Sequence, residues 1–124
     1  MTDIFVFGSN KLGIHGAGAA LTARLKYGAK TGDCSGRTGN AYAIPTKNTP
    51  SKDKRQIPLN EILEDVLVFL RYAAKHPELT FIVTRVGCGL AGYLDSEIAY
   101  MFADYTPNVK LPAEWLDIAN KKED

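Results

Sequence analysis

The sequence predicts an α/β domain with a mainly parallel sheet and helices on its faces. Short apolar stretches at residues 4–7, 41–44 and 81–84 alternate with helical patterns, as strands and helices do in such folds. Glycine-rich stretches follow the first and third of them. Because open α/β sheets bind ligands beyond the carboxyl ends of their strands, we expect one domain over residues 1–124 with its ligand site at that edge.

Composition agrees with a single globular domain and argues against several classes of partner. The chain has 124 residues, of which 45% are hydrophobic and 23% charged, and its formal net charge is +1. This small charge lacks the basic excess of proteins that bind nucleic-acid phosphates, although Lys47, Lys52, Lys54 and Arg55 form a local basic patch. We therefore do not expect nucleic acid to be the default partner.

The expected location is the cytoplasm, and no membrane association is expected. The first residues lead directly into a strand pattern without a signal sequence, and no stretch is long enough to span a bilayer. Two cysteines, Cys34 and Cys88, form neither a disulfide framework nor a metal-binding spacing. We expect no structural metal and no cofactor.

In the first half of the chain, the apolar stretch at residues 4–7 predicts a buried strand in the middle of the fold. A helix is predicted over residues 19–27, with Gly28 as its C-cap. Residues 29–40 are rich in glycine and turn formers, which predicts a functional or mobile loop. A second strand over residues 41–44 is expected to end at residues 45–47 because Pro45 stops it.

In the second half, residues 48–56 are polar and predict an exposed loop. The strongest helix starts at residue 58 or 60 and ends at residue 75, because the residue before Pro77 resists the helical conformation. A buried strand is expected at residues 81–84, a third helix at 96–105 and a short strand at 108–111, followed by a fraying end at 120–124. The expected apolar face of the long helix consists of Ile62, Leu63, Val66, Leu67, Phe69, Leu70 and Ala73, and the residues expected to cap the core are Trp115, Leu116 and Ile118.

Two glycine-rich segments are the candidate ligand site. We call residues 8–18 the first glycine loop and residues 85–93 the second glycine loop. Each follows a predicted strand and precedes a predicted helix, where exposed backbone N–H groups and the helix dipole favour an anion such as phosphate. The residues expected to contact the ligand are Gly8, Ser9, Asn10, Gly13, His15, Gly16, Ala17, Gly18, Ala19, Arg85, Gly87, Cys88, Gly89, Leu90, Ala91, Gly92 and Tyr93.

The spacing of Gly87, Gly89 and Gly92 also matches the G-x-G-x-x-G fingerprint of NAD-binding Rossmann proteins. That fingerprint requires an acidic residue about 20 positions further on, after the next strand. Glu114 is the only candidate for this role, and no second half of a Rossmann fold follows it. A NAD-dependent Rossmann-type protein is therefore the minor alternative.

The glycine motifs resemble those of macrodomains, in particular the type found in DarG antitoxins and the terminal ADP-ribose glycohydrolase. Residues 10–21 resemble the first ligand loop N-x-x-G-x-x-G-x-G-x-A-L of this family. Residues 44–47, I-P-T-K, resemble its F-P-T-K strand end, and residues 86–92, V-G-C-G-L-A-G, resemble its L-G-C-G-N-G-G loop. The chain also resembles small phage-encoded proteins that share the blocks F-G-S-N, H-G-A-G-A, Y-A-I-P-T-K and G-C-G-L-A-G-Y.

The resemblance implies a minimal three-layer α/β/α macrodomain-like fold that binds ADP-ribose or a relative. It implies that the backbone of residues 16–19 and 87–92 surrounds the diphosphate and distal ribose, and that Asn10 contacts that ribose. It also implies that Lys47 attacks the anomeric carbon as a nucleophile. The alternatives are a turn role for Asn10 and a solvated surface lysine at position 47. The family's adenine-binding strand and turn precede the segment at which this chain starts, so the resemblance leaves adenine recognition unassigned.

The catalytic partners are less well matched to the family. The family shows G-G-L-D after the second loop, whereas this chain has Gly92-Tyr93-Leu94-Asp95, which places the carboxylate one residue later. Asp95 is therefore a candidate acid, with helix capping as the favoured alternative. His15 is a candidate for phosphate contact or acid–base chemistry. Tyr93 is a candidate to stack on a ribose or pack in the core, and Cys88 is expected to serve as a small residue rather than a nucleophile.

The resulting functional expectation is a protein that binds ADP-ribose or another NAD-derived nucleotide through the two glycine loops. Such a protein could sequester a NAD-derived defence signal for a phage. The alternative is an ADP-ribosyl hydrolase with Lys47 as nucleophile and Asp95 or His15 assisting. The partner would be a small molecule or an ADP-ribosylated macromolecule, with nucleic acid included only if it is ADP-ribosylated, and a homo-oligomer stays open.

Overall fold

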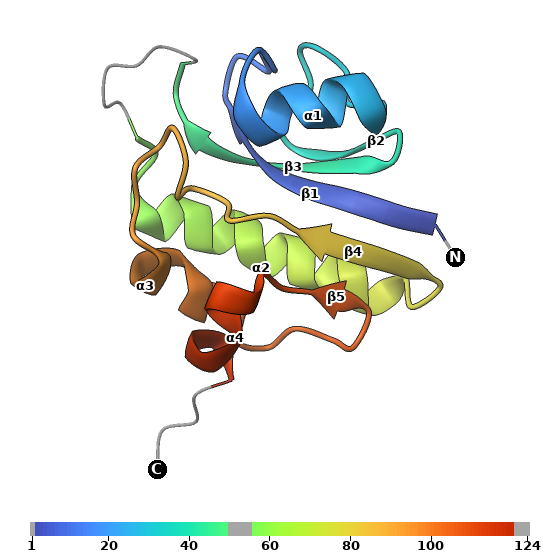
Figure 1. Ribbon diagram of the computed structural model, residues 1–124, viewed down its shortest axis with the longest axis vertical. Coiled ribbons are helices and arrows are strands. Elements are labelled where there is room, and N and C mark those ends of the chain that lie inside the picture. The colour runs from blue at the N-terminus through green and yellow to red at the C-terminus, as the bar shows by residue number, and fades with distance from the viewer. Residues whose placement is uncertain (1, 50–55, 121–124) are drawn as a thin grey trace.

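A computed structural model describes residues 2–49 and 56–120 and shows one five-stranded sheet between helices (Figure 1). The strand order is β2-β3-β1-β4-β5. All neighbouring strands are parallel except β2, which is antiparallel to β3. The expected α/β fold class with a mainly parallel sheet is confirmed. The strands are β1 (Thr2–Asn10), β2 (Gly36–Thr38), β3 (Ala41–Lys47), β4 (Leu79–Val83) and β5 (Val109–Lys110).

The helices form the two outer layers of the fold. Helix α1 (Gly18–Lys26) lies on one face of the sheet, and α2 (Leu59–Lys75) lies on the other (Figure 1). The second face also carries α3 (Asp95–Ile98), the 3-10 helix η1 (Ala99–Phe102) and α4 (Ala113–Ala119). This arrangement agrees with the expected three-layer architecture.

Alternation along the central strands explains why the sheet is covered on both faces. In β1, Ile4 and Val6 belong to the large core under α2, whereas Phe7 belongs to a smaller core under α1. Successive side chains of a strand point to opposite faces, so a continuous apolar stretch supplies both cores. The smaller core is rich in alanine, including Ala20 and Ala23 of α1, and these small side chains allow α1 to lie close to the sheet.

The position of β1 in the middle of the sheet is confirmed and determines where a ligand can bind. The chain continues from β1 to β3 on one side and later returns to β4 on the other side of β1. A reversal of strand order of this kind leaves a crevice at the carboxyl ends of the strands. Strand β3 continues through Pro45 to Lys47, because β2 pairs with β3 only as far as Ala43 and a residue without an N–H is tolerated where one side is unpaired.

Two of the predicted helices agree with the structure and one differs. Helix α1 begins at Gly18, one residue earlier than expected, and ends before Gly28, whose φ of +78° is typical of the residue after a helix. Helix α2 agrees with the prediction and ends at Lys75, with His76 as its C-cap residue before Pro77. The expected helix at residues 96–105 is instead the short α3 followed by η1, a tighter turn that brings Phe102 within 5.3 Å of the Trp115 ring.

Other expectations about elements were also wrong in detail. The segment at 29–40 contains the short strand β2 and is not only a loop. Strand β4 is buried on one face only, since Ile82 is 36% exposed. On α2, Leu67 is 39% exposed rather than part of the apolar face. Trp115 lies in the core on a helix, α4, that the sequence patterns did not predict. The expected fraying end beyond residue 120, and Lys52, Lys54 and Arg55 of the basic patch, lie outside the described residues.

Candidate functional site

A cavity of about 650 Å³ opens at the carboxyl ends of β1, β3 and β4, where both glycine loops meet. Its size is within the roughly 300–1,000 Å³ of small-molecule sites. The prediction that the two loops lie at one edge of the sheet is therefore consistent with the geometry. The lining residues are Gly8, Asn10, Ile14, Gly16, Ala17, Gly18, Ala19, Ala20, Thr46, Lys47, Thr84, Arg85, Gly87, Cys88, Gly89, Leu90 and Ala91.

The end of the first glycine loop and the start of α1 line the cavity and carry a series of unused backbone donors. In the described part of the chain, no atom accepts a hydrogen bond from the N–H groups of residues 16–20, whereas the next amide, Leu21, donates to the Ala17 carbonyl at 3.2 Å. These groups include the first turn of α1, which has no intrahelical acceptors for them. Five successive donors at a helix N-terminus are well suited to bind an anion.

Asn10 and Gly13 give the first glycine loop its shape. The Asn10 side chain donates to the Ile14 carbonyl at 2.8 Å and accepts from the Ile14 N–H at 3.2 Å. Asn10 therefore has the turn role, although it also lines the cavity. At Gly13, φ is +68° and an added Cβ would lie 2.4 Å from the Gly32 carbonyl carbon. A residue other than glycine would push this loop away from the segment 29–40.

The second glycine loop is closed by its own backbone and has further unused donors. The Cys88 N–H donates to Arg85, the Gly92 N–H to Gly89 and the Tyr93 N–H to Gly87, at 2.9 to 3.0 Å. Within residues 2–49 and 56–120, no acceptor binds the N–H groups of Gly87, Gly89, Leu90 or Ala91. The second glycine loop therefore has a second set of unused donors on residues that line the same cavity.

Gly8 lies near the end of β1, where it lines the cavity and packs against Gly87 and Thr46. A Cβ at this position would lie 3.3 Å from both the Gly87 nitrogen and the Thr46 Oγ1 atom. Such contacts are tighter than those of nearly all real side chains. The absence of a side chain at Gly8 therefore lets the second glycine loop approach the strand ends closely.

The charged side chains among the described lining residues, Lys47 and Arg85, are both cations. Lys47 is the last residue of β3, where it pairs with Asn10 of β1, and it is 5% exposed. Its burial contradicts the alternative of a solvated surface lysine. Two sets of backbone donors on the lining residues, with basic and no acidic side chains among the described ones, are the features expected of an anion site.

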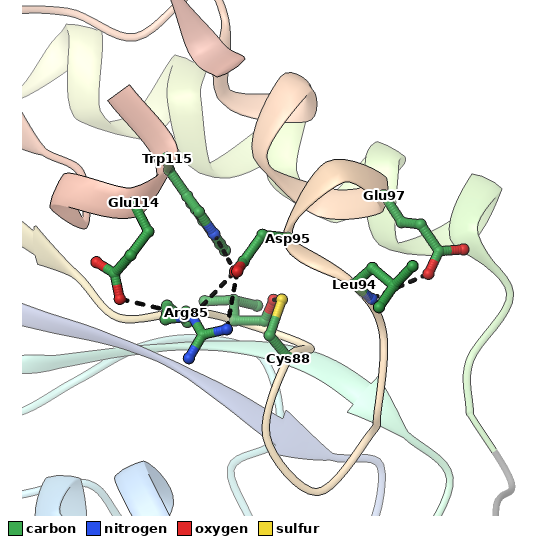
Figure 2. A network of polar contacts seen from close by, with 8 residues as sticks. Arg85, Cys88, Leu94, Asp95, Glu97, Glu114 and Trp115 are labelled. Atoms are coloured by element: carbon green, nitrogen blue, oxygen red, sulfur yellow. Dashed lines mark hydrogen bonds and ion pairs between the residues drawn. The ribbon is translucent and has the colours of Figure 1, made fainter. Parts of the chain in front are cut away.

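Arg85 is held by a polar network next to the second glycine loop (Figure 2). Its Nε and Nη2 atoms donate to the two carboxylate oxygens of Asp95 at 2.9 and 2.8 Å. The Trp115 Nε1 atom donates to the same carboxylate at 2.6 Å, and the Glu114 carboxylate lies 3.9 Å from Arg85 Nε. The network ties the start of the second glycine loop to α3 and α4.

These contacts define the roles of Asp95 and Cys88. The hydrogen bonds from Arg85 and Trp115 lower the pKa of Asp95 to about 2. A carboxyl group with so low a pKa does not donate a proton near neutral pH, so Asp95 is a poor general acid. The favoured capping role is also wrong, because the Asp95 carboxylate accepts from Arg85 and Trp115, and Glu97 accepts at 2.9 Å from the amide of Leu94, the N-cap residue before α3. Burial raises the pKa of the Cys88 thiol to about 12, which agrees with a non-nucleophilic residue.

His15 does not line the cavity. Its side chain is 1% exposed and its ring meets Phe7 edge-on at a centroid distance of 5.2 Å. Neither ring nitrogen has a hydrogen-bond partner in the described part of the chain. The candidate roles of His15 in ligand contact and acid–base chemistry have no support from this position. His15 packs the first glycine loop against β1 instead.

Four other residues expected at the ligand also lie behind the loops rather than in the cavity. The Ser9 hydroxyl donates to the Cys34 carbonyl, and Gly13 packs on Gly32. An added Cβ at Gly92 would lie 3.5 Å from Gln56 Nε2, and the Tyr93 hydroxyl donates to the Ile57 carbonyl at 2.6 Å. These residues fix the loops in place from outside the cavity.

Sequence reasoning missed Ile14, Ala20, Thr46 and Thr84 as lining residues. Thr46 and Thr84 each lie within two residues of the end of a predicted strand. Thr84 donates to the Val6 carbonyl at 2.7 Å and Thr46 to the Ser9 carbonyl at 3.4 Å. The hydroxyl groups of Thr46 and Thr84 therefore bind the backbone of β1. Their place in the cavity lining could have been predicted from the convergence of parallel strand ends at one edge of the sheet.

Comparison with protein-family models, curated proteins and solved structures found no match to this chain. The functional argument therefore depends on the geometry of the site. Among residues 2–49 and 56–120, no helix is long and apolar enough to cross a membrane. In the same ranges, no group of three or more His, Cys, Asp and Glu side chains is arranged to hold a metal ion.

Proposed function

We propose that this protein binds ADP-ribose or a closely related NAD-derived nucleotide in the cavity between the two glycine loops. The observation that carries the proposal is the double set of unused donors, residues 16–20 on one side and Gly87 and residues 89–91 on the other. A diphosphate offers many acceptor oxygens close together, and backbone N–H groups bind them in fixed geometry. The resemblance of both loops to those of macrodomains supports the same ligand class.

The charges of the cavity support an anionic ligand. Lys47 and Arg85 line it, and no described lining residue is acidic. Arg85 is paired with Asp95, so its positive charge is largely neutralised, whereas its Nη1 atom is not part of that pair. Charge-assisted hydrogen bonds to phosphate are stronger than neutral ones. A diphosphate therefore fits this cavity better than a neutral sugar does.

Isothermal titration calorimetry with ADP-ribose tests the proposal. Gly16 and Gly89 have no atom within 4 Å of an added Cβ and no positive φ, so valine at either position should fold while crowding the donor groups. We expect Gly16→Val and Gly89→Val to raise the Kd at least tenfold. Ala74→Val, an exposed change on α2 away from the cavity, should leave it unchanged. No heat with millimolar ADP-ribose would overturn the proposal.

The second candidate is an ADP-ribosyl hydrolase, and the position of Lys47 favours it. The ε-amino group would attack the anomeric carbon, forming a C–N bond as the bond to the target breaks and the target leaves with a proton. Water would then release ADP-ribose. A buried lysine at a strand end in the ligand cavity suits this role. Binding remains the primary proposal, because the described cavity lining has no acid and Asp95 is held by Arg85 and Trp115.

Incubation with an ADP-ribosylated protein or DNA separates the two candidates. A hydrolase should release ADP-ribose with multiple turnovers and lose this activity in Lys47→Ala, while Lys47→Arg should still bind. A binder should release an intact nucleotide on denaturation, without turnover. The resemblance to phage proteins extends the binding proposal to sequestration of a NAD-derived defence signal, with the cytoplasm as its setting.

A further inference from the structure

Each glycine loop contributes one exposed, large apolar side chain to the lining of the cavity. Ile14 of the first glycine loop is 43% exposed and Leu90 of the second glycine loop is 60% exposed. Both line the cavity. We call Ile14 and Leu90 the apolar pair. Exposed apolar side chains that line a ligand cavity provide contact area for an apolar part of the ligand.

Three uncharged polar side chains of the cavity, those of Asn10, Thr46 and Thr84, donate hydrogen bonds to the protein's own backbone. The hydroxyl groups of Thr46 and Thr84 donate to the backbone of β1. The Asn10 amide bonds to both backbone groups of Ile14. These three side chains hold the strand ends and the first glycine loop together. They are therefore poorly placed to read the hydrogen-bonding edge of a base.

From this arrangement we propose that the apolar pair holds the nucleobase of the ligand by contact alone and that the site does not discriminate between bases. This inference rests on the proposed function, because it assigns the base of the same nucleotide. A flat ring tethered to a diphosphate can cover Ile14 and Leu90 while the phosphates bind the backbone donors. Apolar contact is non-directional, whereas discrimination between bases requires paired donors and acceptors.

The test compares ADP-glucose, GDP-glucose and UDP-glucose, which differ only in the base, together with inorganic pyrophosphate and ADP-ribose. We expect the three sugar nucleotides to bind within about threefold of one another. Leu90→Ser and Ile14→Ser should each weaken all of them about tenfold, the change expected when roughly half of a large apolar side chain loses its contact. The affinity for pyrophosphate should not change.

The chain provides matched controls for both substitutions. Leu94 is 65% exposed and follows the second glycine loop, and Leu12 is 54% exposed in the first glycine loop. Neither residue lines the cavity. Leu94→Ser and Leu12→Ser should therefore leave every affinity unchanged, and all four variants alter side chains that are at least 43% exposed.

The possible failures are distinguishable. A preference of more than tenfold for one base, or equal losses in the controls and in the apolar-pair variants, would overturn the base assignment while leaving ADP-ribose binding in place. Loss of pyrophosphate affinity in Leu90→Ser would also overturn it, because the side chain would then act on the phosphate donors. Failure of the unmodified protein to bind ADP-ribose would overturn the proposed function and this inference together.

Discussion

The carboxylate of Asp95 accepts two hydrogen bonds from Arg85 and one from Trp115, and these bonds determine its role. It is a positioning residue that holds Arg85 at the cavity and accepts the hydrogen bond of the buried Trp115 indole N–H. Any candidate reaction must therefore obtain its proton from another group. Lys47 differs from Asp95 because it reaches the cavity while being almost fully buried.

The network predicts a pH-dependent stability. The folded-state pKa of Asp95 is lowered to about 2 from the ordinary value of 3.8, so its stabilisation is complete above pH 4 and is lost as the pH falls toward 2. We expect Asp95→Asn to lower the free energy of unfolding by about 1 kcal/mol at pH 7, and by progressively less between pH 4 and 2. Urea denaturation followed by fluorescence of Trp115, the single tryptophan, measures both. A difference that is constant with pH would contradict this assignment.

His15 gives a second prediction at this scale. Its two ring nitrogens are buried without partners in the described chain, and unpaired buried polar atoms destabilise a fold. We expect His15→Leu to raise the free energy of unfolding by about 1 kcal/mol and to leave ADP-ribose affinity unchanged. His15→Asn, which keeps a polar side chain, should give no such gain. Lost ligand binding in His15→Leu would restore His15 as a site residue.

At the scale of elements, the second glycine loop depends on one backbone conformation. Gly87 has a φ of +80°, and an added Cβ would lie 3.2 Å from Ile98 Cδ1. We expect Gly87→Ala to lower the free energy of unfolding by about 2 kcal/mol and to weaken ligand binding. Gly89→Ala is the matched control, since Gly89 has neither a positive φ nor a neighbour within 4 Å. Equal thermal stability of the two variants would show that the loop adapts.

The elements that could be predicted from sequence are those whose signal is local. The apolar face of α2 and the stop at Pro77 follow from periodicity and from the backbone restriction before proline. The antiparallel strand β2 has three residues and depends on pairing with β3, which no local pattern reveals. The packing of Phe102 in η1 on Trp115 in α4 is a contact between two elements, which no local pattern reveals.

At the scale of the whole molecule, the site results from the order of the strands. Two glycine loops that are about 70 residues apart in sequence line one cavity because β4 pairs with β1. The sequence motifs predicted this convergence, and also the backbone donors. They could not predict that His15 and Tyr93 face the protein, because side-chain direction in a loop depends on packing against β1 and Ile57.

This architecture predicts that ligand binding stabilises the entire fold. The proposed ligand bridges the end of β1, the N-terminus of α1 and the loop after β4, so it binds only where both outer layers are in place. At about 100 times its Kd, a ligand of the native state contributes about 2.7 kcal/mol, which corresponds to a rise in Tm of roughly 10 °C for a domain of this size. Differential scanning calorimetry with ADP-ribose measures this rise. Gly16→Val and Gly89→Val should keep the Tm of the free protein but lose about half of the rise or more at the same nucleotide concentration, because a tenfold higher Kd reduces the contribution of the ligand to about 1.4 kcal/mol. A full rise in either variant would mean that the nucleotide binds elsewhere.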